Sequence, residues 1–358
     1  MSEILAARDG ALARLTLNRA GALHALNTTM CAAMSAALLA WRDDPGVSAV
    51  LIDHAAGTRG FCAGGDIRML AESGAGDGRA AREFFFTEYR LNHVIKTYPK
   101  PIVTLIDGVT MGGGVGISVH GTYRVATERT VFAMPETGIG LFPDVGGSWF
   151  LPRLPGEIGA WLALTGARLR AADCLEAGLA THYVPSELLG AVVAQIAGAA
   201  QTGDARAALA SGLDALSESA GSTQHLSRVH RELINVLFAF DRVEEIFVAL
   251  AGDGSDGALA QLEALRSKSP QTLKVALRQI RLGAKLTDFA DAMAMEYRIG
   301  ARVVGRHDFL EGVRAVIVDK DNAPRWNPAT LEAVSEALLD EIFAPLPAGE
   351  EWTPLEAN

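Results

Sequence analysis

Two carboxylates lie close together in an otherwise apolar part of the sequence and could do acid–base chemistry. Glu136 follows Pro135, Asp144 follows Pro143, and the chain between the two acids reads Thr-Gly-Ile-Gly-Leu-Phe-Pro. A charge in apolar surroundings is unfavourable unless it finds a partner or does chemistry. Two carboxylates held near one another have their pKa values pushed apart, which lets one act as an acid and the other as a base. Composition alone leaves open whether they are solvated loop residues or members of a catalytic site.

Two glycine-rich turns could supply backbone N–H groups to a developing negative charge. Gly64–Gly65 and Gly112–Gly114 each follow a strand-like stretch and each lead into a helix-like one. Glycine lets the backbone approach a ligand atom closely, and N–H groups at such a turn can bind an oxyanion. One such turn is usually only a chain reversal, but two of them could each give one N–H to the same oxygen.

Two other motifs resemble catalytic patterns but lack the required context. Gly252–Gly257 fits the bare dinucleotide-binding pattern, yet it lies among helices, so we expect a loop between two helices. The stretch Gly116-Ile-Ser-Val-His120 is one residue short of a nucleophile elbow. On a helix Ser118 and His120 would point to nearly opposite sides, so we expect a packed short helix.

The elements that must position these groups alternate between strands and helices in the first half of the chain. Apolar and alternating stretches predict strands at residues 11–18, 47–53, 101–107, 122–126, 131–133 and 181–184. Helices are predicted after the N-cap Asn27 up to about residue 42, and at residues 67–70, 79–98 and 114–120. This alternation favours an α/β fold.

The second half of the chain has a mainly helical pattern. An Ala/Gly/Ser-rich stretch at residues 197–222 predicts a linker or a loose helix. The clearest helical patterns beyond it are at residues 241–250, 270–282 and 288–304. An extended segment is predicted at residues 319–328 and a last helix at 329–343.

Composition limits the classes of protein to which the chain can belong. Its 358 residues suggest about two domains. The net charge of -10 argues against a nucleic-acid partner, because no basic field is available to neutralise phosphates. Cys31, Cys62 and Cys174 have no paired spacing, which favours a reducing compartment and no zinc site. We find neither a signal-peptide pattern nor an apolar run of membrane-spanning length, and therefore expect a cytoplasmic protein without a membrane partner.

Three motifs together resemble those of one enzyme superfamily. Phe61–Ile67, Met111–Gly116 and Met134–Gly146 look like the crotonase (enoyl-CoA hydratase/isomerase) superfamily and, within it, the 3-hydroxyisobutyryl-CoA hydrolase branch. The resemblance extends over nearly the whole chain, through residues 88–92, 120–128, 308–315, 319–320 and 324–328.

The resemblance implies an architecture and a ligand. It implies an α/β fold with a crotonase-type spiral of ββα units in residues 1–200, carrying the active site, and a mainly helical region in residues 201–358 that covers it. The ligand implied is an acyl-CoA thioester. No metal and no cofactor are implied, since CoA is part of the substrate. The superfamily often forms trimers and hexamers, so a homo-oligomer is among the expectations.

The resemblance also assigns roles to the residues already singled out. The oxyanion hole would be formed by the backbone N–H groups of Gly65 and Gly113. Glu136 matches the catalytic glutamate that is shared with hydratases, and Asp144 matches the second carboxylate of the hydrolase branch. Glu88 matches a further substrate-site position, so the substrate-binding set is Glu88, Gly113, Glu136 and Asp144.

Departures from the hydratase pattern bear on the reaction. Hydratases of this superfamily have a second glutamate where this chain has Gly116, and usually have glycine where it has Asp144. Addition of water across a double bond needs two groups to handle the water, so we expect hydrolysis of a thioester instead. The expected substrate is a short-chain 3-hydroxyacyl-CoA: 3-hydroxyisobutyryl-CoA of valine breakdown or a close relative of it. Glu136 would either attack the thioester or activate a water. An enoyl-CoA hydratase or isomerase is the alternative, and a non-catalytic CoA-binding protein is a third reading.

A second departure falls near the expected CoA site. The superfamily commonly has Pro, Lys and Asn where this chain has Ala20, Gly21 and His24. Arg19 and Arg59 are candidates for holding the CoA phosphates.

Overall fold

The chain folds into two compact units that are discontinuous in sequence. The structure is a computed structural model that describes residues 2–355. The first unit contains the described residues up to Gly65, then Arg90–Ala133 and Arg168–Leu226. The second contains Asp66–Tyr89, Met134–Ala167 and the described residues from Ser227 onward. These units do not coincide with a division at residue 200, and a helical region that covers the site stays a prediction.

A six-stranded sheet forms the centre of the first unit. Its order is β1(Ile4–Asp9), β2(Leu12–Leu17), β3(Ala49–His54), β5(Ile102–Ile106), β7(Tyr123–Ala126) and β9(His182–Tyr183). Only the β1–β2 pair is antiparallel; the other neighbours are parallel. The strands predicted in these regions are confirmed. β5 is buried along its whole length, as expected for a parallel strand covered on both faces.

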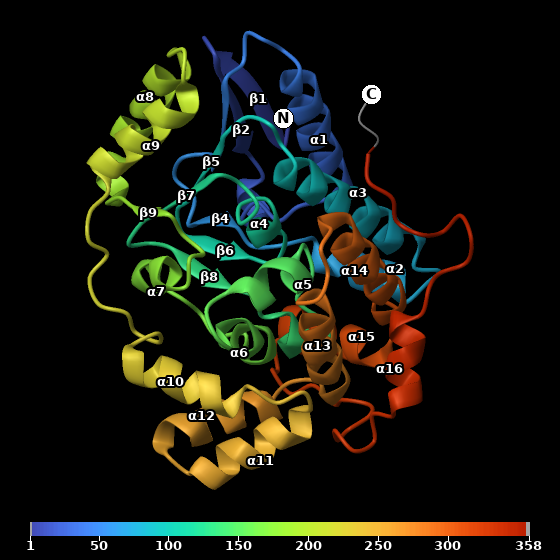
Figure 1. Cartoon of the computed structure of the whole chain (residues 1–358). Helices are drawn as coiled ribbons and strands as arrows, with labels where there is room; N and C mark the ends of the chain where they lie inside the picture. The colour runs from blue at the N-terminus through green and yellow to red at the C-terminus, as the bar shows by residue number, and fades with distance from the viewer. Residues whose placement is uncertain (1, 356–358) are drawn as a thin grey trace. The chain divides into compact units, whose positions relative to one another are not determined.

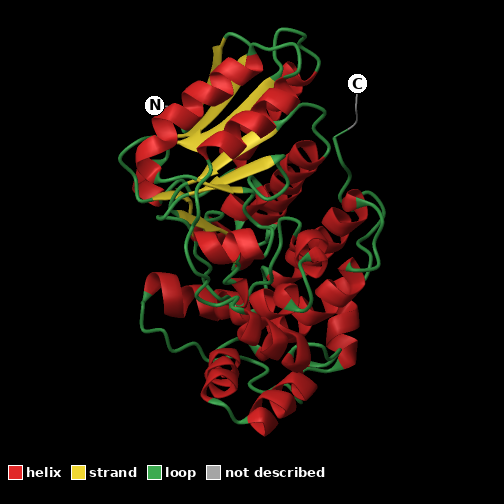
Figure 2. Ribbon diagram, turned by 60° about the vertical axis from the view of Figure 1, so that its left-hand side comes forward, coloured by secondary structure: helices red, strands yellow, loops and turns green. Residues whose placement is uncertain are grey.

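A second, three-stranded parallel sheet carries the glycine turns. Its order is β4(Gly60–Cys62), β6(Val109–Met111) and β8(Val131–Ala133); Figure 2 draws the strands of both sheets in yellow. We predicted β8 but neither β4 nor β6, because each is only three residues long and merges with a glycine-rich turn. Since β4 and β6 are neighbours, the turns that follow them leave the sheet side by side.

Helices complete the first unit. They are α1(Thr28–Arg42), the C-terminal part of α3(Arg79–Lys96), α4(Gly113–Gly116), α7(Ala171–Glu176), α8(Leu189–Ala200) and α9(Ala205–Leu216). The predicted N-cap is confirmed, because the Asn27 side chain accepts a hydrogen bond of 2.8 Å from the Met30 N–H. Helix α4 is shorter than the predicted helix at 114–120.

Residues 197–222, predicted to be a linker or a loose helix, are mostly helical and well packed. The segment contains the end of α8 and all of α9, which lie against one another (Figure 1). Ile196, Leu209 and Leu213 are fully buried in one cluster with Leu12 and Val103 of the sheet. Ala-rich composition hid a helix whose few large apolar residues recur at helical spacing, and tertiary packing stabilises such a helix.

The second unit is almost wholly helical. It contains α2(Ile67–Gly74), the N-terminal part of α3, α5(Gly147–Phe150), α6(Ile158–Thr165), α10(Arg228–Leu237), α11(Val243–Asp253), α12(Asp256–Arg266), α13(Pro270–Gly283), α14(Phe289–Val303), α15(His307–Val313) and α16(Glu336–Phe343). The three clearest helical predictions are confirmed as α11, α13 and α14. The loop expected at Gly252–Gly257 is confirmed: Gly254 ends α11 with a φ of 67° and Ser255 caps α12.

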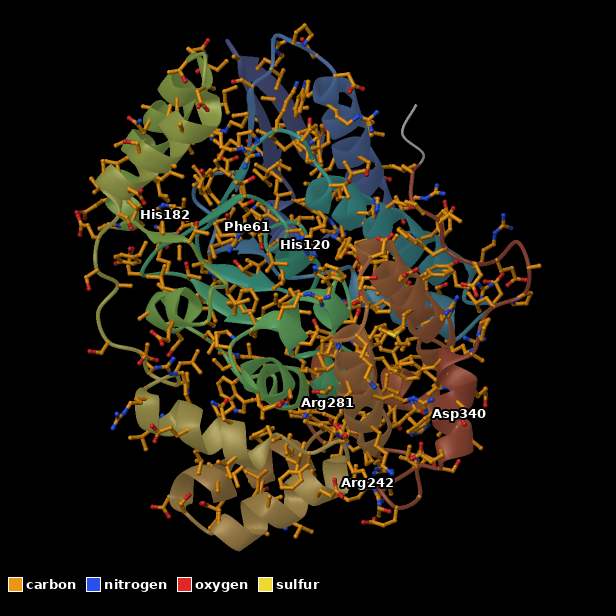
Figure 3. All side chains as sticks on the ribbon, viewed as in Figure 1. Phe61, His120, His182, Arg242, Arg281 and Asp340 are labelled. Atoms are coloured by element: carbon orange, nitrogen blue, oxygen red, sulfur yellow. The ribbon has the colours of Figure 1, made fainter. Side chains whose placement is uncertain are left out.

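The last predicted helix begins later than expected. Residues 329–335 form turns, and Ser335 caps α16 by accepting from the Leu338 N–H at 3.2 Å. Arg281 of α13, labelled in Figure 3, joins distant parts of this unit because its guanidinium bonds the Glu157 carboxylate at 2.8 Å and the Phe238 carbonyl at 2.9 Å. Among the described residues no helix is both long enough and apolar enough to cross a membrane.

Candidate active site

Glu136 is the buried first residue of a single turn of 3₁₀-helix, Glu136–Ile139. Gly140 ends this turn in the left-handed conformation, with a φ of 70°. A Cβ at Gly140 would lie 2.1 Å from the Asp308 carbonyl oxygen, and one at Gly312 would lie 2.4 Å from the Ile139 backbone. Helix α15 therefore packs directly against the turn that carries Glu136, and only glycine allows this approach.

Asp144 lies eight residues further on, at the start of a second tight turn. Its Oδ2 accepts a hydrogen bond of 2.9 Å from the Tyr89 hydroxyl on α3. Its carbonyl accepts from the Gly147 N–H at 2.8 Å, which closes the turn. Val145 and Gly146 have φ values of 52° and 89°, so both adopt the left-handed region. A β-branched residue such as valine rarely adopts this conformation, so the surroundings must hold the turn.

Helices α13 and α14 provide this support. The Gln279 side chain of α13 donates to the Pro143 carbonyl. The Glu296 carboxylate of α14 accepts from the Gly146 N–H and from the Ser148 N–H, each at 2.8 Å. The turn is thus bonded by three helices, α3, α13 and α14.

Glu88 is the third predicted carboxylate, and the structure brings it into the same electrostatic cluster. It lies on α3 next to Tyr89 and is 1% exposed. Its Oε1 and the Oε2 of Glu136 are buried and accept no hydrogen bond among the described residues. Unpaired buried carboxylate oxygens are unfavourable in a fold, and they are the groups that substrate atoms or water can satisfy.

Burial dominates the electrostatics of this cluster. It raises the pKa of Glu136 well above the ordinary range, and the Asp144 charge raises it further. Burial raises the pKa of Asp144 to about 7, although the hydrogen bond from Tyr89 opposes the shift. The pKa of Glu88 is also raised well above its ordinary value, first by burial and then by Asp144, Glu136 and Glu296. These carboxyl groups therefore bind protons at higher pH than free carboxyl groups do, so one member can donate a proton while another accepts one.

Sequence reasoning missed Tyr89 and Glu296. Both are completely buried polar residues, at 0% exposure, in helices with apolar faces. The available signal was an acid in Met293-Ala-Met-Glu296-Tyr and a tyrosine beside Glu88. Neither pattern says which distant segment the side chain will meet.

The two glycine turns meet in the first unit. A Cβ at Gly64 would lie 3.5 Å from the Met111 carbonyl and 3.9 Å from the Gly113 nitrogen. The Gly64 carbonyl accepts from the Leu26 N–H at 2.7 Å, which ties the first turn to the segment before α1. The proximity of the turns agrees with the expectation from the sequence. Their action on one oxygen stays a prediction.

The motif around Ser118 has a structural role. The Ser118 hydroxyl donates to the Gly114 carbonyl at 2.8 Å and to the Val115 carbonyl at 3.0 Å. Ser118 and His120 are both buried (His120 is labelled in Figure 3). Because its own helical turn satisfies the hydroxyl, the packed short segment is confirmed.

His24 forms an anchor in the segment that departs from the superfamily pattern. Its Nδ1 accepts from the Arg19 N–H at 3.0 Å, and its Nε2 lies 3.0 Å from the Thr58 hydroxyl. Burial lowers the pKa of His24 to about 4, so the ring is neutral at physiological pH. Arg19 itself pairs with Glu3 at 3.1 Å.

Comparison with known proteins defines the family. The model of the enoyl-CoA hydratase/isomerase family matches residues 12–343. The chain therefore belongs to the enoyl-CoA hydratase/isomerase family. A curated relative from Gallus gallus, named 3-hydroxyisobutyryl-CoA hydrolase, mitochondrial, is 46% identical over 348 residues, which are 96% of this chain and 89% of the relative.

Two solved structures match nearly the whole chain. A carnitinyl-CoA dehydratase from Mycobacterium thermoresistibile has a TM-score of 0.91 and 38% identity, with 99% of both chains covered. An enoyl-CoA hydratase from Rhodobacter sphaeroides 2.4.1 has a TM-score of 0.88 and 40% identity, covering 98% of this chain and 100% of the other. The predicted crotonase-type α/β fold is confirmed.

The expectation of a cytoplasmic protein is contradicted by these relatives. The curated relatives are named as mitochondrial enzymes. Unpaired cysteines distinguish an oxidising compartment from a reducing one, but they do not distinguish one reducing compartment from another.

Proposed function

We propose that this protein is an acyl-CoA thioester hydrolase that converts 3-hydroxyisobutyryl-CoA to 3-hydroxyisobutyrate and CoA. Curated relatives that are 43–46% identical over 96% of the chain carry the name of this activity. This reaction would serve valine breakdown. It needs only the thioester and water, so the proposal includes no metal and no cofactor.

The observation that carries the proposal is the buried Glu136–Asp144 pair. A thioester hydrolase needs one group to attack the carbonyl or activate water, and one group to manage the second proton. Both carboxyl groups have a raised pKa, about 7 at Asp144, and a carboxylate with a raised pKa is a stronger base once it is ionised. Gly116, where hydratases have their second glutamate, favours hydrolysis over hydration.

The proposed reaction passes through a tetrahedral intermediate. In one route a Glu136 oxygen attacks the thioester carbon, CoA leaves as the thiol after gaining a proton, and water cleaves the resulting anhydride. In the other route Glu136 takes a proton from a water that attacks directly. In both, the N–H groups of Gly65 and Gly113 would stabilise the oxyanion, and one such donor is typically worth ~3–4 kcal/mol in the transition state. Glu88 and Asp144 would bind the 3-hydroxyacyl group.

A thiol-release assay tests the proposal. Purified protein is given 3-hydroxyisobutyryl-CoA and, separately, crotonyl-CoA, and released CoA thiol is measured together with the enoyl absorbance. We expect thiol release from the first substrate only. We expect Glu136→Gln to lower kcat by about 10²-fold or more with little change in binding, because the amide can neither attack nor accept the proton. Activity of the variant within about tenfold of wild type would contradict the role of Glu136.

The second candidate is an enoyl-CoA hydratase or isomerase. The two solved structures that match the whole chain at 38–40% identity are named as a dehydratase and a hydratase, which favours this candidate. It predicts loss of the crotonyl double bond without thiol release. Tight acyl-CoA binding with no turnover of either substrate would favour a non-catalytic CoA-binding protein. A homo-oligomer stays a prediction.

A further inference from the structure

We infer that Glu296 is a positioning residue, whose carboxylate holds the turn Asp144–Ser148 in the conformation that aims the Asp144 side chain. The inference rests on the proposed function in so far as Asp144 acts in it. Glu296 belongs to α14, and 150 residues separate it from Gly146.

Both oxygens of Glu296 are used by the turn. Oε2 accepts from the Gly146 N–H at 2.8 Å, while Oε1 accepts from the Ser148 N–H at 2.8 Å and lies 2.5 Å from the Ser148 hydroxyl. Glu296 is 0% exposed, so no water competes for these donors. A buried carboxylate that accepts three hydrogen bonds from two residues of one turn is a specific anchor, because each lost bond would leave a buried polar group unpaired.

The conformation that Glu296 holds is one that the turn would rarely adopt alone. Val145 has a φ of 52° and Gly146 a φ of 89°, and a β-branched residue disfavours this region. The two N–H groups bound by Glu296 belong to Gly146, which immediately follows this strained residue, and to Ser148 two residues further on. Asp144 immediately precedes it. A relaxed Val145 would turn the Asp144 side chain away from the Tyr89 hydroxyl.

The charge of Glu296 also acts on the acid cluster. The titratable groups that couple with it are Glu88, Tyr89 and Asp144, and Glu136 couples through Asp144. Burial raises the pKa of Glu296 to about 8, and the three donors of the turn oppose the shift. When the carboxyl group is protonated it can donate to the Ser148 hydroxyl and still accept both N–H groups, so the anchor holds in either state.

Glu296→Gln is the variant that separates positioning from general packing. The amide keeps the shape, but it has one acceptor oxygen instead of two, so one N–H of the turn then faces an NH₂ group. Asp291→Asn is the matched control, since it removes an exposed carboxylate from the same helix. Ser148→Ala is a milder second variant that removes only the hydroxyl and leaves both N–H bonds.

The experiment combines steady-state kinetics with amide hydrogen exchange of the peptide 143–150. We expect Glu296→Gln to lower kcat about tenfold or more, because a misplaced group loses near-attack geometry, with KM changed by less than about threefold. We expect faster exchange in this peptide alone. Asp291→Asn should match wild type in all three readouts.

The experiment distinguishes failure of this inference from failure of the proposed function. Wild-type thiol release tests that function, whereas the exchange of residues 143–150 tests the anchor without any activity. Unchanged exchange and unchanged kcat in Glu296→Gln would overturn the inference. If this variant does not fold, Ser148→Ala decides: a lower kcat with faster local exchange supports the anchor, and wild-type behaviour overturns it.

Discussion

At the residue scale, the site consists of carboxyl groups whose pKa values are raised by burial. Glu88, Glu136 and Asp144 all have raised pKa values in the fold. For Asp144 the folded value of about 7 exceeds the ordinary value of 3.8. Between these two pH values the folded state binds more protons than the unfolded state, so stability falls as the pH rises through this range. The cluster is therefore kept at the expense of stability at neutral pH, as is common for catalytic groups.

Tyr89 is the residue that tunes Asp144, and Tyr89→Phe tests this role. Phenylalanine keeps the buried ring but loses the hydroxyl that donates to Asp144 Oδ2 at 2.9 Å. Since this hydrogen bond lowers the pKa of Asp144, its loss raises that pKa further. We expect the pH–rate limb near 7 to move to higher pH by up to about one unit. The profile of kcat/KM measured from pH 5 to 9 checks this, and a limb that stays in place would show that Tyr89 does not act on Asp144.

At the scale of elements, helices from the second half of the chain form the supports of the catalytic turns. Helix α15 packs against Glu136–Ile139 through Gly312, and α13 and α14 bond the Asp144 turn through Gln279 and Glu296. The Ser269 N–H at the start of α13 also donates to the Thr137 carbonyl at 3.2 Å. These contacts are backbone-to-backbone or involve buried side chains, so small changes of shape are transmitted directly to the turns.

Gly312→Ala tests whether the close contact between α15 and the Glu136 turn outweighs the higher helix propensity of alanine. Alanine favours an isolated helix by up to about 1 kcal/mol over glycine, but its Cβ would lie 2.4 Å from the Ile139 backbone. We therefore expect the free energy of unfolding to fall by about 1–3 kcal/mol, together with a lower kcat because Glu136 is displaced.

The matched control is Gly252→Ala in α11, where a Cβ would meet no atom of the described residues 2–355 within 4 Å. That variant should be neutral or slightly more stable. Denaturant unfolding of both variants measures the difference, and equal stabilities would mean that α15 can move away from the Glu136 turn at no cost.

At the scale of the whole molecule, the chain passes repeatedly between two compact units. The first unit ends only at Leu226 and the second contains residues from three separate stretches. The core of the first sheet includes Leu209 and Leu213 from beyond residue 200. The turns of Glu136 and Asp144 depend on residues beyond 227 within their own unit.

A chain shortened to residues 1–200 should therefore fail to fold natively. It lacks two buried leucines of the first core and every partner that α13–α15 give to the catalytic turns. We expect no cooperative thermal transition and no thioester hydrolysis in the shortened chain, and both in the full chain. A cooperative transition with turnover in the shortened chain would instead support a self-sufficient region at residues 1–200.

Much of the fold was predictable because its signals are local. Alternating and continuous apolar stretches located every strand of the six-stranded sheet except β1, and Asn27 located the start of α1. Strands β4 and β6 were missed because each is short and merges with a glycine-rich turn. The tight packing of α9 was missed because its Ala-rich composition hid the helical spacing of its few large apolar residues. In each case long-range packing, and not the local pattern, stabilises the element.

The sequence by itself determined the candidate chemistry: two carboxylates in an apolar stretch, a third at Glu88 by family resemblance, and two glycine turns. Only the tertiary structure decided which partners these groups have. Tyr89 reaches Asp144 across 55 residues and Glu296 reaches Gly146 across 150. The raised pKa values likewise follow from burial and from charges that folding brings together. Motifs are local in the chain, whereas desolvation and hydrogen-bond partners depend on which distant segments pack around them.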